Sequence, residues 1–462
     1  MSLSENPIHL SQRALAHLQR LCLEIPTRRV GSAGNRSATD FFGQTLDSFG
    51  FHTESPTFDC MDWVGHGARL TAGDSSFEAF PSPYSLGCHI RAPLVMASSL
   101  SELEAADLTE RIVLLRGDLA KEQLLPKNFP FYQAEDHRRI IARLESARPH
   151  AVIAATSRDP AMAGAVSPFP LFEDGDFDIP SVYLTEADGA RLAEQAGNVV
   201  DLESGAERRG SSGCNVVAHK AGDTRRRLVL LAHIDSKMGS PGANDNASGV
   251  VVLLLLGEIL GSYSGSLTVE IAAINGEDYY SNPGEQLYLA ANAGRFDDIV
   301  LGVNLDGLGY HKGKVAYSLY ACPPAVRHAV EEAFSGWEAL VQGEPWFQGD
   351  HAMFIMNQTP ALAMTSESIE ELVRDILHSP NDTPDTVDPS NLVAAALALK
   401  DLVAILNRTL RSAAAPAPAS LVLTMAVRSA PCRPNAPEPD PSGRIPNPRR
   451  WSTCDGAHQC AS

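Results

Sequence analysis

Three acidic or imidazole side chains follow apolar stretches that have the length of buried strands. His233 comes directly after LVLLA, Asp278 follows LTVEIAAI by a short NGE sequence, and Asp306 follows IVLGVNL. Loops at the ends of strands in an α/β sheet bring distant residues together, so we expect these three side chains to meet. Imidazole and carboxylate groups are ligands of zinc and related divalent ions. The pattern therefore predicts metal chemistry at this edge of the sheet.

Two further candidate ligands lie in loops. Asp245 lies in SPGANDNASGV, a turn rich in Gly and Asn that leads into an apolar helix, and His378 lies in HSPNDTPDTVD. An Asp before a helix is often only a cap, and a lone His is usually structural. The joint occurrence of five such residues at strand ends and loops favours a metal centre formed by His233, Asp245, Asp278, Asp306 and His378.

Two neighbours of these ligands are candidate catalytic residues. Glu277 precedes Asp278, so one of the two acids can bind metal while the other acts as a general base on water. Asp235 follows His233 by two residues and could lie near the second ring nitrogen, where a carboxylate fixes the tautomer of a metal ligand. The sequence thus predicts hydrolysis by water, with Glu277 and Asp235 assisting.

The elements that must position these residues form a three-layer α/β/α domain with a mixed central sheet. Apolar strands alternate with amphipathic helices across residues 212–411, with helices expected at 248–261, 324–334 and 391–410. Residues 1–60 contain two helical stretches joined by PTRRVGSAGN, and we assign them to the same catalytic domain.

Two other regions differ from the predicted catalytic domain in sequence pattern and composition. Residues 61–211 show short strands such as RIVLLRG, HAVIAAT and IPSVYLT, with a helix at 134–147, which predicts a smaller inserted α/β domain. Residues 412–462 are rich in Pro, Ala and Ser without periodicity, so we expect a disordered tail. Cys454, His458 and Cys460 in that tail are more simply incidental than a further metal site.

Composition narrows the classes of partner. The chain has 462 residues with a net charge of −19, from 37 basic and 56 acidic side chains. Nucleic acids and anionic membranes attract basic surfaces, so the charge argues against both partners and leaves peptides or small amides as substrates. Oligomeric state is not encoded in any pattern.

No segment predicts export or membrane insertion. The first residues lack a basic stretch followed by an apolar core, and the longest apolar run, VVVLLLL, is too short to span a bilayer. The eight cysteines show no CxxC pairs and are expected to be reduced. These features predict a cytoplasmic location.

The sequence resembles the co-catalytic zinc peptidases that include bacterial leucine aminopeptidases, aminopeptidase Y and glutamate carboxypeptidase II. The matching pieces are AHIDS, SPGANDNASGV, NGED, NLDG, GDHAMF and HSPNDTPDTVD. The resemblance covers most of the chain and implies an exopeptidase, most simply an aminopeptidase. It also implies that the inserted region is similar to a protease-associated domain that borders the active site.

The resemblance implies how the ligands are shared between two zinc ions, which Mn²⁺ or Co²⁺ could replace. His233 and Asp306 would hold one ion, Asp278 and His378 the other, and Asp245 would bridge them. Glu277 would be the base.

The chain departs from the family pattern at two positions. The family usually has Glu where this chain has Asp278, and several members place a Tyr where this chain has Leu377. That Tyr helps to stabilise the oxyanion, so its substitute is open among Tyr279, Tyr310 and His351.

Three other functions remain possible from the sequence. A carboxypeptidase, dipeptidase or other amide hydrolase would use the same scaffold with a different specificity pocket. A glutaminyl cyclase-like transferase would hold one zinc. A non-catalytic, receptor-like member would have lost ligands, whereas this chain keeps all five and the base.

Overall fold

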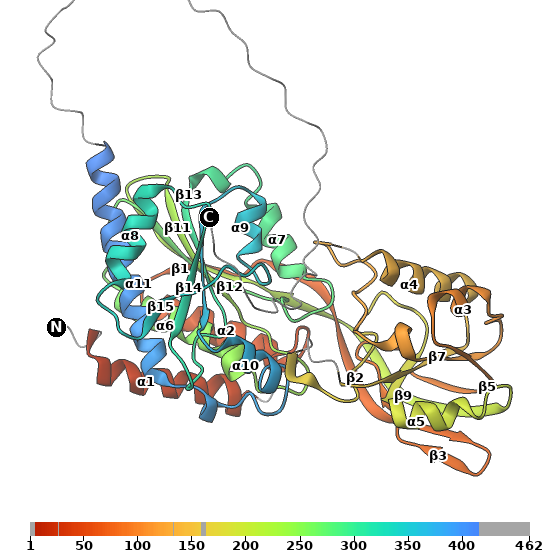
Figure 1. Ribbon diagram of the computed structural model, residues 1–462. Helices are drawn as coiled ribbons and strands as arrows, with labels where there is room; N and C mark the ends of the chain where they lie inside the picture. Colours follow the sequence, from red (N-terminus) through yellow and green to blue (C-terminus); the bar gives the residue numbers. More distant parts are fainter. Residues whose placement is uncertain (1–4, 26, 133, 159–162, 415–462) are drawn as a thin grey trace, which may run out of the picture. The chain divides into compact units, whose positions relative to one another are not determined.

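The computed structural model describes residues 5–25, 27–132, 134–158 and 163–414 (Figure 1). The predicted tail at 412–462 falls almost entirely outside these residues, because helix α11 ends at Ala414. The cysteine and histidine residues of that tail lie outside them as well.

The first of two sheets has eight strands in the order β1-β10-β12-β11-β13-β16-β14-β15. The four central strands β12, β11, β13 and β16 are parallel, whereas β10 and β14 pair antiparallel at their flanks. The sheet is therefore mixed, as predicted. In sheet order the bounds are His52–Glu54, Val216–Lys220, Thr268–Ile274, Arg227–His233, Ile299–Leu305, Ala361–Ser366, Val315–Tyr320 and Leu340–Gln342.

Helices cover both faces of this sheet, which confirms the three-layer prediction (Figure 1). One face packs against α1 (Pro7–Gln19), α2 (Ala33–Ser48), α6 (Ser248–Ile259), α8 (Pro324–Phe334) and α11 (Pro389–Ala414). The other face packs against α7 (Pro283–Ala291) and α9 (Ala352–Met356), and α10 (Ile369–Asp375) follows β16.

Alternation along β11 shows why the layers form. Leu228, Leu230 and Ala232 lie in the core that contains α6 and α11, whereas Val229 and Leu231 lie in the core that contains α7 and α9. A strand buried on both faces reads as a continuous apolar run, because successive side chains point to opposite faces. The apolar stretch before His233 has this origin.

Helix α6 approaches the sheet unusually closely. It is apolar on all sides, and nearly every one of its residues is buried. A Cβ atom at Gly249 would lie 2.3 Å from the backbone oxygen of Leu305 and 3.0 Å from Cβ of Ala232. Only Gly allows this approach, which brings the start of α6 next to the ends of β11 and β13.

The second sheet also has eight strands, in the order β3-β2-β9-β5-β6-β7-β8-β4. Their bounds in that order are Ser75–Phe77, Thr57–Ala72, Val199–Cys214, Cys88–Ala97, Ile112–Leu115, Ala151–Thr156, Ser181–Thr185 and Phe80–Pro81. Helices α3 (Leu100–Ala105) and α4 (Glu135–Ala147) pack on one face, and α5 (Glu186–Ala193) packs on the other.

Two long strands connect the second sheet to the rest of the chain. β2 and β9 pair antiparallel from Thr57 opposite Cys214 to Ala72 opposite Val200, with an irregularity between Gly65 and Ala68. The predicted domain boundaries after residues 60 and 211 fall inside these strands. The sequence pattern predicted short strands within residues 61–211 but did not predict the long antiparallel pair of β2 and β9.

Short helical turns complete the chain. They cover Arg20–Glu24, Gly117–Ala120, Ala163–Ala165, Ala243–Ala247, Phe296–Asp298 and Pro384–Thr386.

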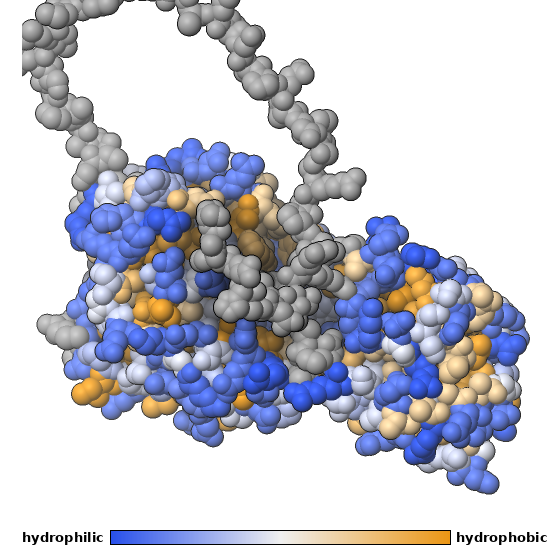
Figure 2. All heavy atoms as spheres, viewed as in Figure 1, coloured by the Kyte–Doolittle hydropathy of each residue, from blue (hydrophilic) through white to orange (hydrophobic). Residues whose placement is uncertain are grey.

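Hydrophilic side chains cover most of the face seen in Figure 2, with small apolar patches between them. Helix α11 is the one described helix that is long and apolar enough to cross a membrane. However, 72% of its apolar window is buried, and its side chains belong to the core beneath the first sheet. Its length and apolarity are those of a core helix.

The described cysteines, which are Cys22, Cys60, Cys88, Cys214 and Cys322, form no disulfide with one another. Cys22 is buried, and burial raises the pKa of its thiol to about 11.

Candidate metal centre

The five predicted ligands meet at one edge of the first sheet. His233 is the last residue of β11, Asp306 follows β13, and Asp278 follows β12 by four residues. These strands are parallel neighbours, so their carboxyl ends lie side by side. Asp245 reaches the same place from the turn before α6, and His378 reaches it from the loop after α10.

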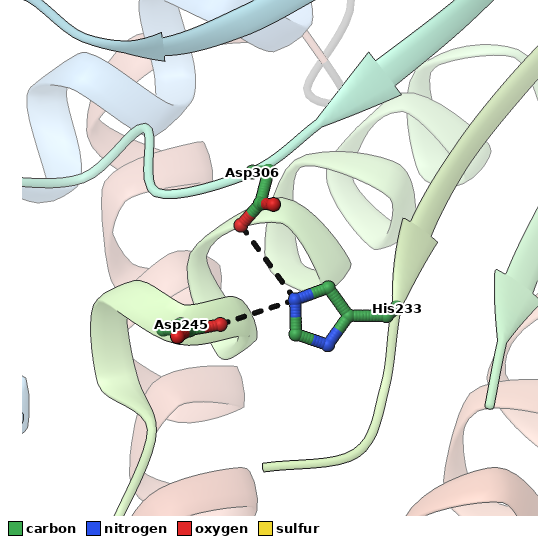
Figure 3. A group of neighbouring side chains, drawn as sticks. All are labelled: His233, Asp245 and Asp306. Carbon is green, nitrogen blue, oxygen red and sulfur yellow. Dashed lines mark ion pairs between the residues drawn. The ribbon is translucent and has the colours of Figure 1, made fainter. Parts of the chain in front are cut away.

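His233, Asp245 and Asp306 form a first ligand group (Figure 3). Nε2 of His233 lies 3.1 Å from Oδ1 of Asp245 and 3.6 Å from Oδ1 of Asp306. The three side chains converge from a strand end, a turn and a second strand end, and the imidazole is almost fully buried.

Asp245, Asp278 and His378 form a second group. Nε2 of His378 lies 3.0 Å from Oδ2 of Asp245 and 3.0 Å from Oδ1 of Asp278. Asp245 therefore directs one carboxylate oxygen to each group. This is the arrangement expected of a carboxylate that bridges two ions.

The spacing of these atoms fits a divalent metal. Ligand atoms about 2.0–2.2 Å from a tetrahedral zinc ion are roughly 3.3–3.6 Å apart, close to the separations within both groups. Carboxylate oxygens lie 3.1–3.7 Å from the ring nitrogens of His233, but neither nitrogen makes a hydrogen bond of good geometry among the described residues, and Oδ2 of Asp278 has no partner there. Buried polar atoms of this kind normally have partners, so the atoms are disposed as ligands.

The electrostatics of the site favour added positive charge. Burial alone would lower the pKa of His233, but the carboxylates of Asp235, Asp245 and Asp306 outweigh it and raise that pKa above its ordinary value. At His378, burial would likewise lower the pKa, but the carboxylates of Asp278 and Asp245 outweigh burial and raise that pKa above its ordinary value. Divalent ions would supply the charge that these carboxylates require.

Glu277 lies beside both ligand groups. One of its oxygens falls within 4.8 Å of ligand atoms of His233 and Asp278, and the side chain is only partly buried. Burial is the main cause that raises its pKa above the ordinary value, with Asp278 adding to the effect and His233 opposing it. Glu277 therefore lies next to the predicted ligands but outside the two ligand groups that share Asp245.

Asp235 lies near the second ring nitrogen of His233 and also makes contacts that were not expected. Its Oδ1 lies 3.7 Å from Nδ1 of His233, which is beyond hydrogen-bond distance. Its two oxygens instead accept hydrogen bonds from the backbone N–H of Gly276 at 2.7 Å and of Asp278 at 3.0 Å. Asp235 therefore holds the turn that carries Glu277 and Asp278.

Sequence reasoning did not identify the role of Asp382. This fully buried carboxylate accepts hydrogen bonds from the backbone N–H of Asn244 at 2.8 Å and of Asp245 at 3.0 Å. It lies four residues after His378, so it ties the two loops that provide ligands. The signal in the sequence is an Asp in the His378 loop, whose partner could not be read from spacing.

Lys237 was also missed. Its Nζ lies 3.0 Å from Oε1 of Glu173, a buried residue of the inserted region, and Oε2 of Glu173 accepts a hydrogen bond from Gln123. Burial would lower the pKa of Lys237, but Glu173, Asp278 and Glu277 raise it. A charged ammonium group thus lies near the carboxylates of Glu277 and Asp278.

The three candidate oxyanion stabilisers are engaged elsewhere. The Tyr279 hydroxyl bonds to the backbone of Met61, and the Tyr310 hydroxyl donates to Glu371 at 2.9 Å. His351 is fully buried, and its Nε2 donates to a backbone oxygen at 2.8 Å. The assignment of an oxyanion stabiliser among these three residues stays a prediction.

Comparison with known proteins gives a family match over the region that forms this site. Residues 215–403 match the model described as Peptidase family M28. This segment contains all five candidate ligands and Glu277.

Two relatives carry aminopeptidase names. A probable lipoprotein aminopeptidase of Mycobacterium tuberculosis is 28% identical over 239 residues, which cover 49% of this chain and 44% of that protein. A probable leucine aminopeptidase 2 of Aspergillus fumigatus is 26% identical over 367 residues, which cover 72% of this chain and 67% of that protein. The chain spans less than half of the length of the first relative.

Solved structures share the fold. An aminopeptidase from Aneurinibacillus sp. strain AM-1 has a TM-score of 0.64 at 22% identity, covering 85% of this chain and 93% of its own. A zinc aminopeptidase from Bacillus subtilis has a TM-score of 0.65 at 19% identity, covering 85% and 94%.

Proposed function

We propose that this chain, whose residues 215–403 belong to peptidase family M28, is a metal-dependent aminopeptidase. The observation that carries the proposal is the pair of ligand groups that share Asp245, with Glu277 directly beside them. The names of the relatives support the same activity.

The residues present fit two divalent ions. His233 and Asp306 would hold one ion, Asp278 and His378 the other, and Asp245 would contact both through its two oxygens. Two imidazoles and three carboxylates suit zinc, and Mn²⁺ or Co²⁺ could replace it. The Bacillus subtilis protein that shares this fold is a zinc aminopeptidase, which supports the choice of zinc.

Such ions, when bound, polarise the scissile carbonyl and lower the pKa of water. Glu277 accepts a proton from the attacking water and passes it to the leaving amine, as the peptide C–N bond breaks. Asp235 keeps Glu277 in place through its hydrogen bonds to Gly276 and Asp278. This assigns Asp235 a positioning role in the same turn.

Cleavage from the amino end follows from the charge of the site. Four carboxylates, those of Asp245, Glu277, Asp278 and Asp306, lie at the predicted metal centre. Glu277 is not assigned as a ligand, so its negative charge can attract the free α-ammonium group of a peptide or small amide. A blocked amino terminus lacks that charge. We therefore expect substrates with a free α-amine to be preferred.

Matched substrates test this proposal. We would strip the full chain of metal and then add Zn²⁺, Mn²⁺ or Co²⁺ in the presence of aminoacyl-p-nitroanilides and their N-acetylated counterparts. Metal-restored cleavage of the unblocked member of each pair is the expected result. Cleavage of the blocked peptides alone would instead indicate a carboxypeptidase-type pocket and would overturn the aminopeptidase assignment.

A further inference from the structure

The turn that carries Asp245 is held by a buried arginine from the amino-terminal region. Arg28 is 1% exposed. Its guanidinium donates to the backbone oxygen of Pro241 at 2.8 Å and to that of Gly242 at 2.7 Å. These two oxygens precede Asp245 by four and three residues.

The same guanidinium also binds the chain next to His233. Its Nε donates to the backbone oxygen of Ile234 at 3.0 Å, and its NH1 group donates to that of Leu21 at 2.9 Å. Arg28 therefore joins the residue that follows one predicted ligand to the turn that precedes another. Its four oxygen partners are all backbone carbonyls.

Asp382 holds the other end of this turn. Its carboxylate accepts the N–H groups of Asn244 and Asp245, and its backbone oxygen accepts the N–H of Ala243 at 3.1 Å. A cation thus binds the carbonyls of residues 241 and 242, and an anion binds the amides of residues 244 and 245. Buried charged side chains therefore hold both the carbonyl groups and the amide groups of this turn.

The chemistry of Arg28 suits the positioning of separate backbone carbonyls better than a simple stabilising role. Burying a guanidinium is costly, and an apolar side chain often stabilises a core as well or better. Its planar fork has several donors in fixed directions, which can set the distance between separate carbonyls. A lysine offers a single ammonium group on a flexible stem, so it cannot reproduce these contacts.

We propose that Arg28 is a positioning residue that sets metal affinity by fixing the Asp245 turn relative to His233. The inference rests on the proposed metal centre and adds a determinant outside its ligands. Residues that orient metal ligands typically change affinity by about 10- to 100-fold when they are replaced.

The test measures metal affinity in the full chain by competition with a chromophoric chelator. Arg28→Met should weaken zinc binding by about 10- to 100-fold, and Arg28→Lys should weaken it as well. The absorption spectrum of bound Co²⁺ should change in both variants, because the geometry of the Asp245 carboxylate is altered. Arg28→Lys retains the charge and serves as the second variant if Arg28→Met does not fold.

Arg227 provides a matched control. It is also buried, and it starts the strand that His233 ends, but it bonds to Glu270 and Asn292 at 2.8 Å. Arg227→Lys should lower the unfolding temperature without changing zinc affinity or the Co²⁺ spectrum.

Two results would overturn the inference. One is unchanged zinc affinity in a folded Arg28 variant, and the other is an equal loss of affinity in Arg227→Lys. Absence of metal binding by the unsubstituted chain would instead refute the proposed metal centre itself.

Discussion

Asp278 shows how a shorter side chain can reach the proposed metal centre. The resemblance predicted a Glu at this position, and Asp is one methylene shorter. Its Oδ1 nevertheless lies 3.0 Å from Nε2 of His378, and its backbone N–H is bound by Asp235. The carboxylate therefore reaches the shared site from its turn, and the substitution keeps the ligand set.

Replacing Glu277 with Gln should separate catalysis from metal binding. Gln keeps the size of the side chain but cannot accept the proton from water, so we expect kcat to fall by about 10²- to 10⁴-fold. Metal content should stay as in the unsubstituted chain, because Asp245, Asp278, Asp306 and the two histidines remain. Steady-state kinetics and elemental analysis of the same sample check both points, and loss of metal would show that Glu277 is itself a ligand.

The individual ligands could be predicted because each stands at a recognisable place in the sequence. His233, Asp278 and Asp306 follow apolar strands, and parallel strands end at one edge. Arg28 and Asp382 could not be predicted in the same way. Their partners are backbone carbonyls and amides of residues 241–245, and such contacts leave no pattern of side-chain types.

Elements were predictable where periodicity was strong. The helix expected at 324–334 is α8 with the same bounds, and the strands around His233 and Asp306 agree within one or two residues. Strands β14 and β15 were not predicted. β15 has three residues and none of them is buried, whereas β14 is mostly buried but its sequence VAYSLY is not a continuous apolar run. The contact between α6 and β13 at Gly249 depends on tertiary packing, which local sequence does not record.

Helix α1 should make the protein sensitive to mild acid. His17 is 4% exposed and packs against Phe41. Burial, with help from the charge of Arg13, lowers its pKa from 6.5 to about 4. Between pH 6.5 and 4 the unfolded chain takes up a proton that the folded chain does not. The free energy of unfolding therefore falls as the pH is lowered, by at most about 1.4 kcal/mol for each pH unit.

His17→Leu should remove this contribution. Chemical denaturation at several pH values between 6.5 and 4 should show a shallower fall in the free energy of unfolding than in the unsubstituted chain, by about 3 kcal/mol over the whole range. His52→Leu is the control, because the His52 side chain is 79% exposed. Equal pH dependence in His17→Leu and the unsubstituted chain would contradict the argument.

At the scale of the whole molecule, the inserted region directly contacts the turn that carries Glu277 and Asp278. Tyr279 follows Asp278, and its hydroxyl accepts the N–H of Met61 in β2 at 2.8 Å and donates to the Met61 oxygen at 3.1 Å. The ion pair between Lys237 and Glu173 makes a second link. The resemblance to a protease-associated domain stays a prediction, but these contacts place the insert beside the site.

Tyr279→Phe should weaken this link. Loss of the hydroxyl removes two hydrogen bonds, each of which contributes about 1 kcal/mol net, so the free energy of unfolding should fall by about 1–2 kcal/mol. The activity should fall while the metal content is unchanged, because the turn that carries Glu277 is less firmly held. Tyr183→Phe removes a hydroxyl from β8 and is the control; equal kinetic effects in both variants would refute the coupling.

The central claim is that one chain holds two metal ions that share Asp245. The most direct test is the number of zinc ions per folded chain, measured by elemental mass spectrometry after metal is restored and excess is removed. We expect two ions per chain. A single ion, as a glutaminyl cyclase-like site would hold, or none, as a non-catalytic relative would hold, would contradict it.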